Sequence, residues 1–337
     1  MLLVGVALAA AASAGAPASK AAPATDYRAA VETLESALSS AYPIPKVANL
    51  YASALKRNLA AGRYAGLAPC DLASRLTGDL QGVHRDVHLH VSCAPPSPAG
   101  PPPAPVEPIQ AAQMVGGSVF FLASRTSWPL TQEACQAVVS AMAKAKGAKY
   151  VVVDLRDNFG GTGIIGNLIA SYFYALDESH MLLRGAFRDH ALDTQEGTYP
   201  YVPGPRLPDA KVYIAVNAAT ASAAEGFAFG LQRAGRATVV GETTAGAGIA
   251  GDDVDIGDGL RAFVPFKLIL AADGSKGWEG VGVTPDVRTG PGQELDRIAA
   301  LISADLGDGR TASRALWSSR ARPAASSACR RPPRPRP

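Results

Sequence analysis

Ser222 lies between an apolar stretch and an amphipathic stretch, in the run IAVNAATASAAEGFAFGLQ that begins at residue 214. A serine at a strand-to-helix junction has its hydroxyl where the Ala223 amide and the helix dipole stabilise negative charge. The hydroxyl is therefore placed for nucleophilic attack, and an oxyanion beside it would be stabilised. The alternative is that Thr220 or Ser222 only caps the helix, which is a common role for these residue types.

A second glycine-rich segment, VVVDLRDNFGGTGIIG, begins at residue 151. It matches G-x-G-x-x-G at Gly161, Gly163 and Gly166. However, four residues separate the strand from the first glycines, and no second strand that ends in an acidic residue follows. A dinucleotide site is therefore not expected. The backbone amides of Gly160 and Gly161 could instead donate to an oxyanion. Glycine allows such a close approach of main chain to substrate.

Three histidines, His84, His88 and His90, lie close together in the sequence. A metal site is the weaker interpretation, because the first two span a helix-to-strand change and no HExxH pattern accompanies them. A single catalytic histidine with two surface neighbours fits the segment better. An isolated histidine can also be purely structural, since geometry rather than presence identifies a base.

Composition restricts the class of protein. The chain of 337 residues is 47% hydrophobic, enough for about two domains with a substantial core. Eight arginines from Arg310 onward account for the positive formal charge, so the rest of the chain has a net charge of about −5. It has no basic patch interleaved with aromatic residues, and nucleic acid is not an expected partner.

The first residues, MLLVGVALAAAASAGAPA, are typical of an export signal. The apolar run of about eleven residues is too short to span a bilayer, and small residues that suit cleavage follow it. A positive n-region is missing, and a disordered alanine-rich leader is the alternative. We expect residues 1–24 to be a signal peptide and the protein to be periplasmic or secreted, with no stable membrane span.

Four cysteines do not make a disulfide framework in a chain of this length. Cys70 and Cys93 could pair in an exported protein, but their spacing does not decide it. We expect free core thiols for all four, including Cys135 and Cys329. The spacing shows no metal-binding pattern.

The remaining pattern divides the chain at a proline-rich segment. Three helical periodicities, at 26–42, 44–62 and 70–84, precede a strand at 87–93 and predict a helical domain over 25–93. Residues 94–110 form a linker, because their proline density excludes a helix or a central strand. The basic tail at 307–337 is too polar to bury a core, and is expected to be disordered or the product of a frameshift.

Strands and helices alternate through residues 111–306. The pattern predicts strands at 118–124, 149–155 and 261–270, with helices at 131–147, after the glycine loop and after Ser222. This alternation is typical of an α/β domain.

Several segments together resemble the serine peptidase family of the tail-specific (C-terminal processing) proteases and the tricorn core. The similarity is closest to the branch of the interphotoreceptor retinoid-binding protein modules. The segment LTGDLQGVHRDVHLHV resembles the DxHLxV segment of that branch, and VVVDLRDNFGG resembles its oxyanion loop. The segment TASAAEGFAFGLQ resembles the nucleophile helix, and WEGVGVTPDV resembles the closing motif. The resemblance implies a ClpP/crotonase-like β/α spiral core with a small N-terminal helical domain.

The resemblance also implies a role for each matching position. Ser222 would be the nucleophile, and the amides of Ala223 and of Gly160 or Gly161 would form the oxyanion hole. His88 would be the general base, and Glu279 would be the group that orients it. A serine needs such a base, and a carboxylate on the far ring nitrogen stabilises the imidazolium. Neither a cofactor nor a metal is implied.

The chain departs from the family in several places. The processing proteases use a lysine base in a pattern FGKG, whereas this chain has Ala247 there and no lysine between Val212 and Phe266. A Ser/Lys dyad is therefore not expected, which leaves His88 as the base. Ile249 and Val87 replace a histidine and a serine of related branches. No PDZ domain fits between the helical segment and the core, so substrate choice would come from the cleft.

Two functions follow from these observations. The first is an exported serine peptidase that cleaves peptides or unfolded polypeptides through an acyl-enzyme. The second is a non-catalytic module that binds a retinoid- or lipid-like hydrophobic ligand, or a peptide, on the same fold. Retention of Ser222, His88, Glu279 and the glycine loop favours the enzyme. The cleft would lie between the helical domain and the core; the oligomeric state is not readable.

Overall fold

The computed structural model describes residues 26–93, 106–188 and 193–307. The expected leader, most of the expected linker and nearly all of the expected tail lie outside the described residues. Within the described residues, no helix is both long and apolar enough to cross a bilayer.

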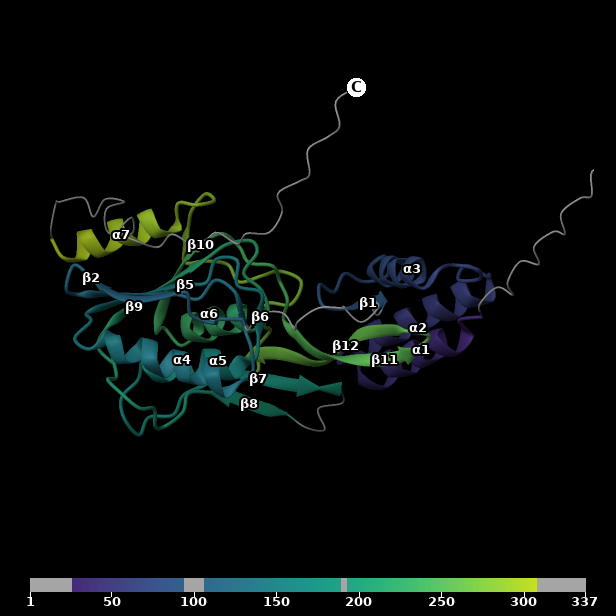
Figure 1. Cartoon of the computed structure of the whole chain (residues 1–337), viewed down its shortest axis with the longest axis horizontal. Coiled ribbons are helices and arrows are strands. Elements are labelled where there is room, and N and C mark those ends of the chain that lie inside the picture. The colour runs from purple at the N-terminus through teal and green to yellow at the C-terminus, as the bar shows by residue number, and fades with distance from the viewer. Residues whose placement is uncertain (1–25, 94–105, 189–192, 308–337) are drawn as a thin grey trace, which may run out of the picture.

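The N-terminal part consists of three helices, as the sequence periodicity predicts (Figure 1). They are α1 (Arg28–Ala41), α2 (Pro45–Ala60) and α3 (Pro69–Gln81). Proline occupies the first position of α2 and α3, where its missing N–H removes no hydrogen bond. Each helix buries one apolar face; that of α1 is formed by Ala30, Val31, Leu34 and Leu38.

A six-stranded sheet forms the centre of the core, and five of its strands are parallel. In spatial order the strands are β13 (Val287–Arg288), β10 (Ala237–Gly241), β9 (Lys211–Val216), β5 (Tyr150–Asp154), β3 (Val119–Ala123) and the antiparallel edge strand β2 (Ala111–Val115). The strands β3 and β5 are buried along their whole length, as is usual for strands covered on both faces.

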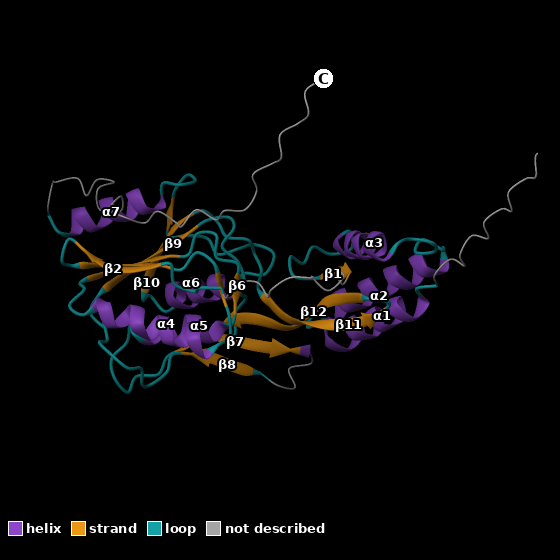
Figure 2. Cartoon of the chain, viewed as in Figure 1, coloured by secondary structure: helices purple, strands orange, loops and turns teal. Residues whose placement is uncertain are grey.

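Helices cover both faces of this sheet (Figure 2). One face packs against α4 (Gln132–Met142), α5 (Gly163–Ser171) and α6 (Ala223–Arg233); a short 3-10 helix, Ala143–Ala145, continues α4. The other face packs against α7 (Glu294–Asp305), through Ile298 and Ile302. The expected α/β core with an N-terminal helical part is confirmed.

A second sheet connects the core to the helices. Its path is β1 (His90–Cys93), β12 (Leu260–Ala271), β7 (Met181–Phe187) and β8 (Thr194–Gly197), and β11 (Ile249–Gly257) also pairs with β12. The β11–β12 hairpin reaches the helical part in Figure 1. Its residues Ile249, Ile256, Leu260, Ala262 and Val264 share one hydrophobic cluster with the three helices.

A disulfide joins Cys70 at the start of α3 to Cys93 at the end of β1. The free-thiol interpretation is therefore wrong for this pair. It failed because the helix and the strand are adjacent in space, which the spacing of 23 residues does not reveal. Cys135 is a free cysteine, as expected, and Cys329 lies outside the described residues.

Candidate active site

The loops around Ser222 all follow the carboxyl ends of neighbouring parallel strands. The glycine loop follows β5, the Ser222 turn follows β9 and the segment 242–248 follows β10. Because these strands are adjacent and parallel, their ends meet at one edge of the sheet. Ligand sites of open α/β sheets commonly lie at such an edge.

Ser222 itself has a strained backbone. It precedes the first residue of α6 with φ 55° and ψ −123°, and it is one of four described non-glycine residues with positive φ. Residues in sparsely populated conformations persist only where the surroundings hold them, and they concentrate at functional sites. A serine on a sharp strand-to-helix turn is also the geometry of a nucleophile elbow, in which the hydroxyl projects from the turn.

Thr220 and Asn158 hold the turn that precedes Ser222. The buried Thr220 hydroxyl donates to the Leu155 carbonyl at 2.9 Å and accepts from the Asn217 amide. The Ala221 amide donates to the Asn158 carbonyl at 2.9 Å. Both contacts tie the turn to the segment after β5, so Thr220 positions the turn rather than capping α6.

Glu225 connects Ser222 to the loop after β10. Its fully buried carboxylate accepts hydrogen bonds from four donors: the Ser222 amide at 2.8 Å, the Thr244 hydroxyl at 2.5 Å, the Gly246 amide at 2.7 Å and the Ala247 amide at 2.8 Å. Burial raises the pKa of Glu225, and these hydrogen bonds act in the opposite direction. The sequence interpretation assigned this residue no role, although the S-x-x-E spacing is that of a capping box.

Gly160 packs directly against the nucleophile turn. A Cβ on Gly160 would lie 2.6 Å from Ser222 Cβ and 2.7 Å from the Ala223 nitrogen, and its φ of +90° also favours glycine. Gly160 and Gly161 form the short strand β6, which pairs with β4 (Ser127–Trp128). The close approach explains why the loop carries glycine at this position.

The Asn158 side chain holds the glycine loop against the segment after β3. This side chain is completely buried; it donates to the Ser124 carbonyl at 2.7 Å and accepts from the Gly160 amide at 2.8 Å. The Gly160 amide thus already has an acceptor, which makes Gly161 the better oxyanion donor of the two. Gly161 and Ala223 line the same pocket as Ser222.

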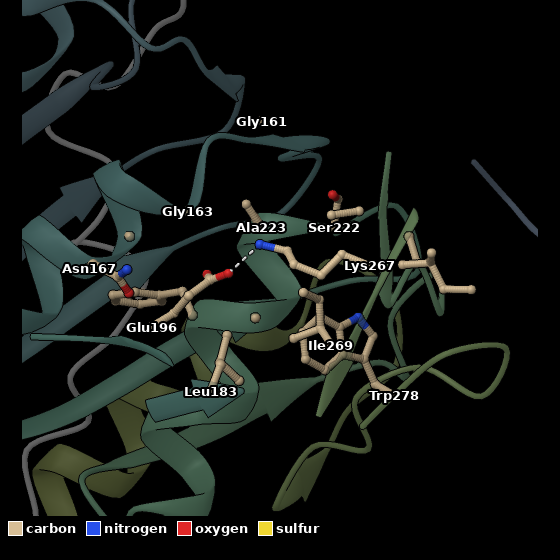
Figure 3. A pocket seen from close by; sticks show the side chains of 16 residues that line it. Gly161, Gly163, Asn167, Leu183, Glu196, Ser222, Ala223, Lys267, Ile269 and Trp278 are labelled. Carbon is tan, nitrogen blue, oxygen red and sulfur yellow. Dashed lines mark hydrogen bonds and ion pairs between the residues drawn. The ribbon is translucent and has the colours of Figure 1, made fainter. Parts of the chain in front are cut away.

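That pocket has a volume of about 110 Å³ and is mostly apolar (Figure 3). Its walls include the side chains of Leu183, Phe227, Ile249, Ile269 and Trp278. All lining residues lie between Gly161 and Trp278, and none comes from the helical part. The cleft that we expected between the helical part and the core is therefore not this pocket.

Lys267 enters the pocket from β12, and Figure 3 shows its side chain together with Ser222 and Ala223. Its Nζ lies 2.7 Å from Glu196 Oε1. The sequence interpretation missed both residues. Lys267 directly follows the lysine-free interval that ends at Phe266. The available signal was the alternation along the predicted strand, which places Lys267 and Ile269 on one face.

His88 does not line the pocket beside Ser222. Its ring stacks on Phe263 with centroids 5.6 Å apart, and its backbone amide donates to Asp86. The His88 Nδ1 is buried, and among the described residues it has no hydrogen-bond partner; no hydrogen bond joins His88 to Ser222 or Glu279. Burial lowers the pKa of His88 and so favours the neutral imidazole, while Asp86 opposes the shift.

Glu279 lies at the junction of the core and the helical part. Its Oε2 accepts from the Gly248 amide at 2.5 Å, whereas Oε1 is buried without a partner in the described chain. Burial, followed by the nearby Asp86, raises the pKa of Glu279 to about 7. A second cavity of about 240 Å³ is lined by Glu279 and its neighbours Ala245 and Gly280, and by His84, Arg85 and Val87.

Ser222, Ala223, Gly160 and Gly161 therefore lie together, whereas neither His88 nor Glu279 lines the pocket beside Ser222. His84 rather than His88 shares a cavity with Glu279. The three histidines do not assemble a metal site: no group of three or more potential His, Cys, Asp or Glu ligands occurs in the described ranges. The arrangement around Ser222 can activate a carbonyl for attack by the hydroxyl.

Comparison with protein families gives two adjoining matches. The model for peptidase family S41 matches residues 122–289. The model for the N-terminal domain of S41 peptidases in eukaryotic IRBP matches residues 24–118. The two matches meet near the end of the expected proline-rich linker and together cover most of the described chain.

Individual proteins are similar over parts of the chain. The carboxyl-terminal-processing peptidase 1 of Arabidopsis thaliana, a chloroplastic protein by its name, is 34% identical over 148 residues, 43% of this chain and 28% of that protein. The carboxyl-terminal-processing protease of a Picosynechococcus strain is 36% identical over 148 residues, 42% of this chain and 32% of that protein. The aligned stretch thus spans about a third of the length of these relatives.

Among solved structures, the photosystem II D1 C-terminal processing protease has a similar fold. The TM-score is 0.52 at 15% sequence identity, and the match covers 80% of this chain and 94% of that chain. At this identity the similarity concerns the fold.

Proposed function

This chain belongs to peptidase family S41, and we propose that it is an exported serine peptidase with Ser222 as its nucleophile. One observation carries the proposal: the strained Ser222 lines an apolar pocket together with the Ala223 and Gly161 backbone. An acyl-transfer enzyme needs a nucleophile, two oxyanion donors and a cavity for the substrate at one point.

In the proposed reaction, His88 Nε2 or Nδ1 accepts the Ser222 hydroxyl proton while Oγ attacks the scissile carbonyl carbon. The carbonyl oxygen becomes an oxyanion that the amides of Ala223 and Gly161 stabilise. The histidine then donates its proton to the leaving amine, the C–N bond breaks and an acyl-enzyme remains. Water, deprotonated by the same histidine, hydrolyses the ester and releases the second product.

This role of His88 requires a movement. The ring now stacks on Phe263 and must approach Ser222 Oγ before the first proton transfer. Catalytic hydrogen bonds are often long in enzymes without substrate and tighten in the Michaelis complex. In the proposed mechanism Glu279 orients the imidazole and stabilises its charged form, which likewise requires the two side chains to meet.

The substrates that we propose are peptides or unfolded polypeptides, in line with the two relatives named as carboxyl-terminal-processing enzymes. Export to the periplasm or the medium rests on the signal-like residues 1–24. We also propose that residues 25–93 and 111–306 act as a helical domain and a peptidase core on either side of the linker.

Labelling with a fluorophosphonate tests the nucleophile. We expect modification at Ser222, identified by peptide mapping, and its complete loss in Ser222→Ala, with kcat on a peptide substrate reduced by about six orders of magnitude or to the detection limit. Ser275→Ala, an exposed serine far along the chain, is the matched control and should be labelled normally.

A binding module for a hydrophobic ligand or a peptide is the second candidate function. The separation of His88 from Ser222 favours it, because a serine without a base is a poor nucleophile. Folded wild-type protein that is neither labelled nor active on a peptide library would support the binding module and contradict the peptidase.

A further inference from the structure

An ion pair forms the polar end of the pocket beside Ser222. Lys267 on β12 and Glu196 on β8 lie on either side of β7, and Nζ and Oε1 are 2.7 Å apart. Both side chains are mostly buried, with 18% and 23% of their surface exposed. Figure 3 shows the pair facing the cavity that Ser222 and Ala223 also line.

The position of Lys267 is built into the sheet. Its aliphatic stem crosses β7 at Gly185, where a Cβ would lie 2.6 Å from Lys267 Cδ and 2.4 Å from the Thr194 hydroxyl. Any larger residue at Gly185 would displace the lysine. The glycine therefore provides the path by which an amine from β12 reaches the carboxylate on β8.

The ion pair also separates two cavities. Gly163, Asn167, Glu196 and Lys267 line both the small apolar pocket and a larger cavity of about 570 Å³. A side chain that enters from Ser222 meets the pair as the far wall. The volume on the Ser222 side, about 110 Å³, is below the roughly 150 Å³ of an apolar cavity that takes a benzene ring.

The chemistry of this wall selects against charge. Lys267 and Glu196 neutralise each other, so a carboxylate or an ammonium brought beside them would repel one partner and remain uncompensated in a largely desolvated pocket. An uncharged side chain keeps the pair intact and buries its methylenes against Leu183 and Ile269. The indole nitrogen of Trp278, buried and without a partner in the described part of the chain, offers a donor to a polar tip.

We propose that the Lys267–Glu196 ion pair is the specificity determinant of the substrate pocket. The pocket then takes an uncharged side chain of medium length, such as leucine, methionine or glutamine, from the residue whose carbonyl Ser222 attacks. It rejects acidic and basic side chains at that position. This inference rests on the proposed function, because it assigns the pocket to the acyl part of a peptide substrate.

Charge-altering variants test the proposal with five peptides that carry Leu, Met, Gln, Glu or Lys before the scissile bond. Binding is measured by fluorescence anisotropy in a Ser222→Ala background, where no acylation occurs, and kcat/KM is measured in the active protein. For the unaltered pair we expect the Gln peptide to bind at least tenfold better than the Glu and Lys peptides.

Each single variant should change the preference in a defined direction. Lys267→Met leaves the Glu196 charge uncompensated, and the Lys peptide should gain at least tenfold relative to Gln. Glu196→Gln leaves the lysine charge and should favour the Glu peptide by a similar factor. The double variant Lys267→Met/Glu196→Gln should again reject both charged peptides. Lys211→Met is the control: it breaks an exposed ion pair with Asp305 and should leave the order of peptides unchanged.

The outcomes distinguish this inference from the proposed function. An unchanged peptide order in both single variants, with circular dichroism showing a native fold, overturns the specificity role. Loss of turnover on every peptide in Lys267→Met with unaltered binding also overturns it, because the lysine would then act in catalysis. A switched binding order in a protein that cleaves nothing supports the pocket and contradicts the peptidase.

Discussion

The Glu225 carboxylate accepts a hydrogen bond of 2.8 Å from the Ser222 backbone amide and two further hydrogen bonds from the amides of Gly246 and Ala247. A single buried side chain thus ties the strained serine to the loop after β10, whose Ala247 lines the same pocket. The strain at Ser222 is stable only because such contacts over-determine the turn.

Glu225→Gln should therefore destabilise the protein. The amide group of glutamine would point a donor at a site where four donors already converge, and buried donors would lose their acceptor. We expect a loss of about 2–4 kcal/mol in the free energy of unfolding, measured by urea denaturation. Glu133→Gln, on the exposed surface of α4, is the control and should change it by less than about 0.5 kcal/mol.

Gly160→Ala should move the nucleophile. The new methyl group would clash with Ser222 Cβ and the Ala223 nitrogen, and displacement of reacting groups by about 1 Å lowers rates by about 10²-fold. The readout is the rate of fluorophosphonate labelling. Gly147 also has a positive φ, of +82°, but a Cβ there would have no atom within 4 Å. Gly147→Ala should therefore carry a similar backbone strain without slower labelling. Equal labelling rates would show that the glycine loop does not constrain Ser222.

His88→Ala should reduce kcat by about four orders of magnitude if His88 is the base. His90 also stacks on Phe263, with centroids 6.0 Å apart, and His90→Ala is therefore a matched control with an expected effect of less than threefold. His84→Ala should be similarly mild. A severe loss in His84→Ala would instead assign the base to the histidine that shares a cavity with Glu279.

Glu279 should make both activity and stability depend on pH. Its pKa is raised to about 7, so the folded protein binds its proton more tightly than the unfolded chain does. The free energy of unfolding should therefore fall as pH rises from about 4.5 to about 7, by on the order of 3 kcal/mol. Glu279→Gln, which stays neutral, should remove that slope in urea denaturation at pH 5 and pH 8.

Activity should follow the opposite direction. If the ionised Glu279 orients the imidazole, kcat/KM rises with pH through about 7. In Glu279→Gln the remaining acid limb should reflect His88, whose pKa burial lowers below its usual 6.5. An acid limb that is the same in both proteins would exclude Glu279 from the catalytic apparatus.

The elements of the fold were predictable because their signals are local. Apolar periodicity located the three N-terminal helices and the buried strands, and the change from an apolar to an amphipathic stretch located the Ser222 turn. The β11–β12 hairpin was only half predicted: its second strand was expected at 261–270. Its path into the helical part depends on contacts between residues more than 150 positions apart, which no local pattern encodes.

The site was predicted in part for the same reason. Ser222, Ala223 and the glycine loop follow adjacent parallel strands, so topology brings them together. Lys267 and Glu196 come from a different sheet, with β7 between their strands. Their contact depends on the register of β7 and on the absence of a side chain at Gly185, over which Lys267 passes. Disulfide pairing of Cys70 with Cys93 similarly required the position of β1 beside α3.

The long hairpin of β11 and β12 has a thermodynamic consequence. Since Ile256 and Leu260 supply apolar surface to the cluster around Leu34, the interior of the helical part is complete only when the hairpin of the core packs into it. Melting of one part exposes the other to water, and the two should denature in one cooperative transition. Separate expression of either part would expose the apolar face of the hairpin or of the three helices to water, and each part should aggregate.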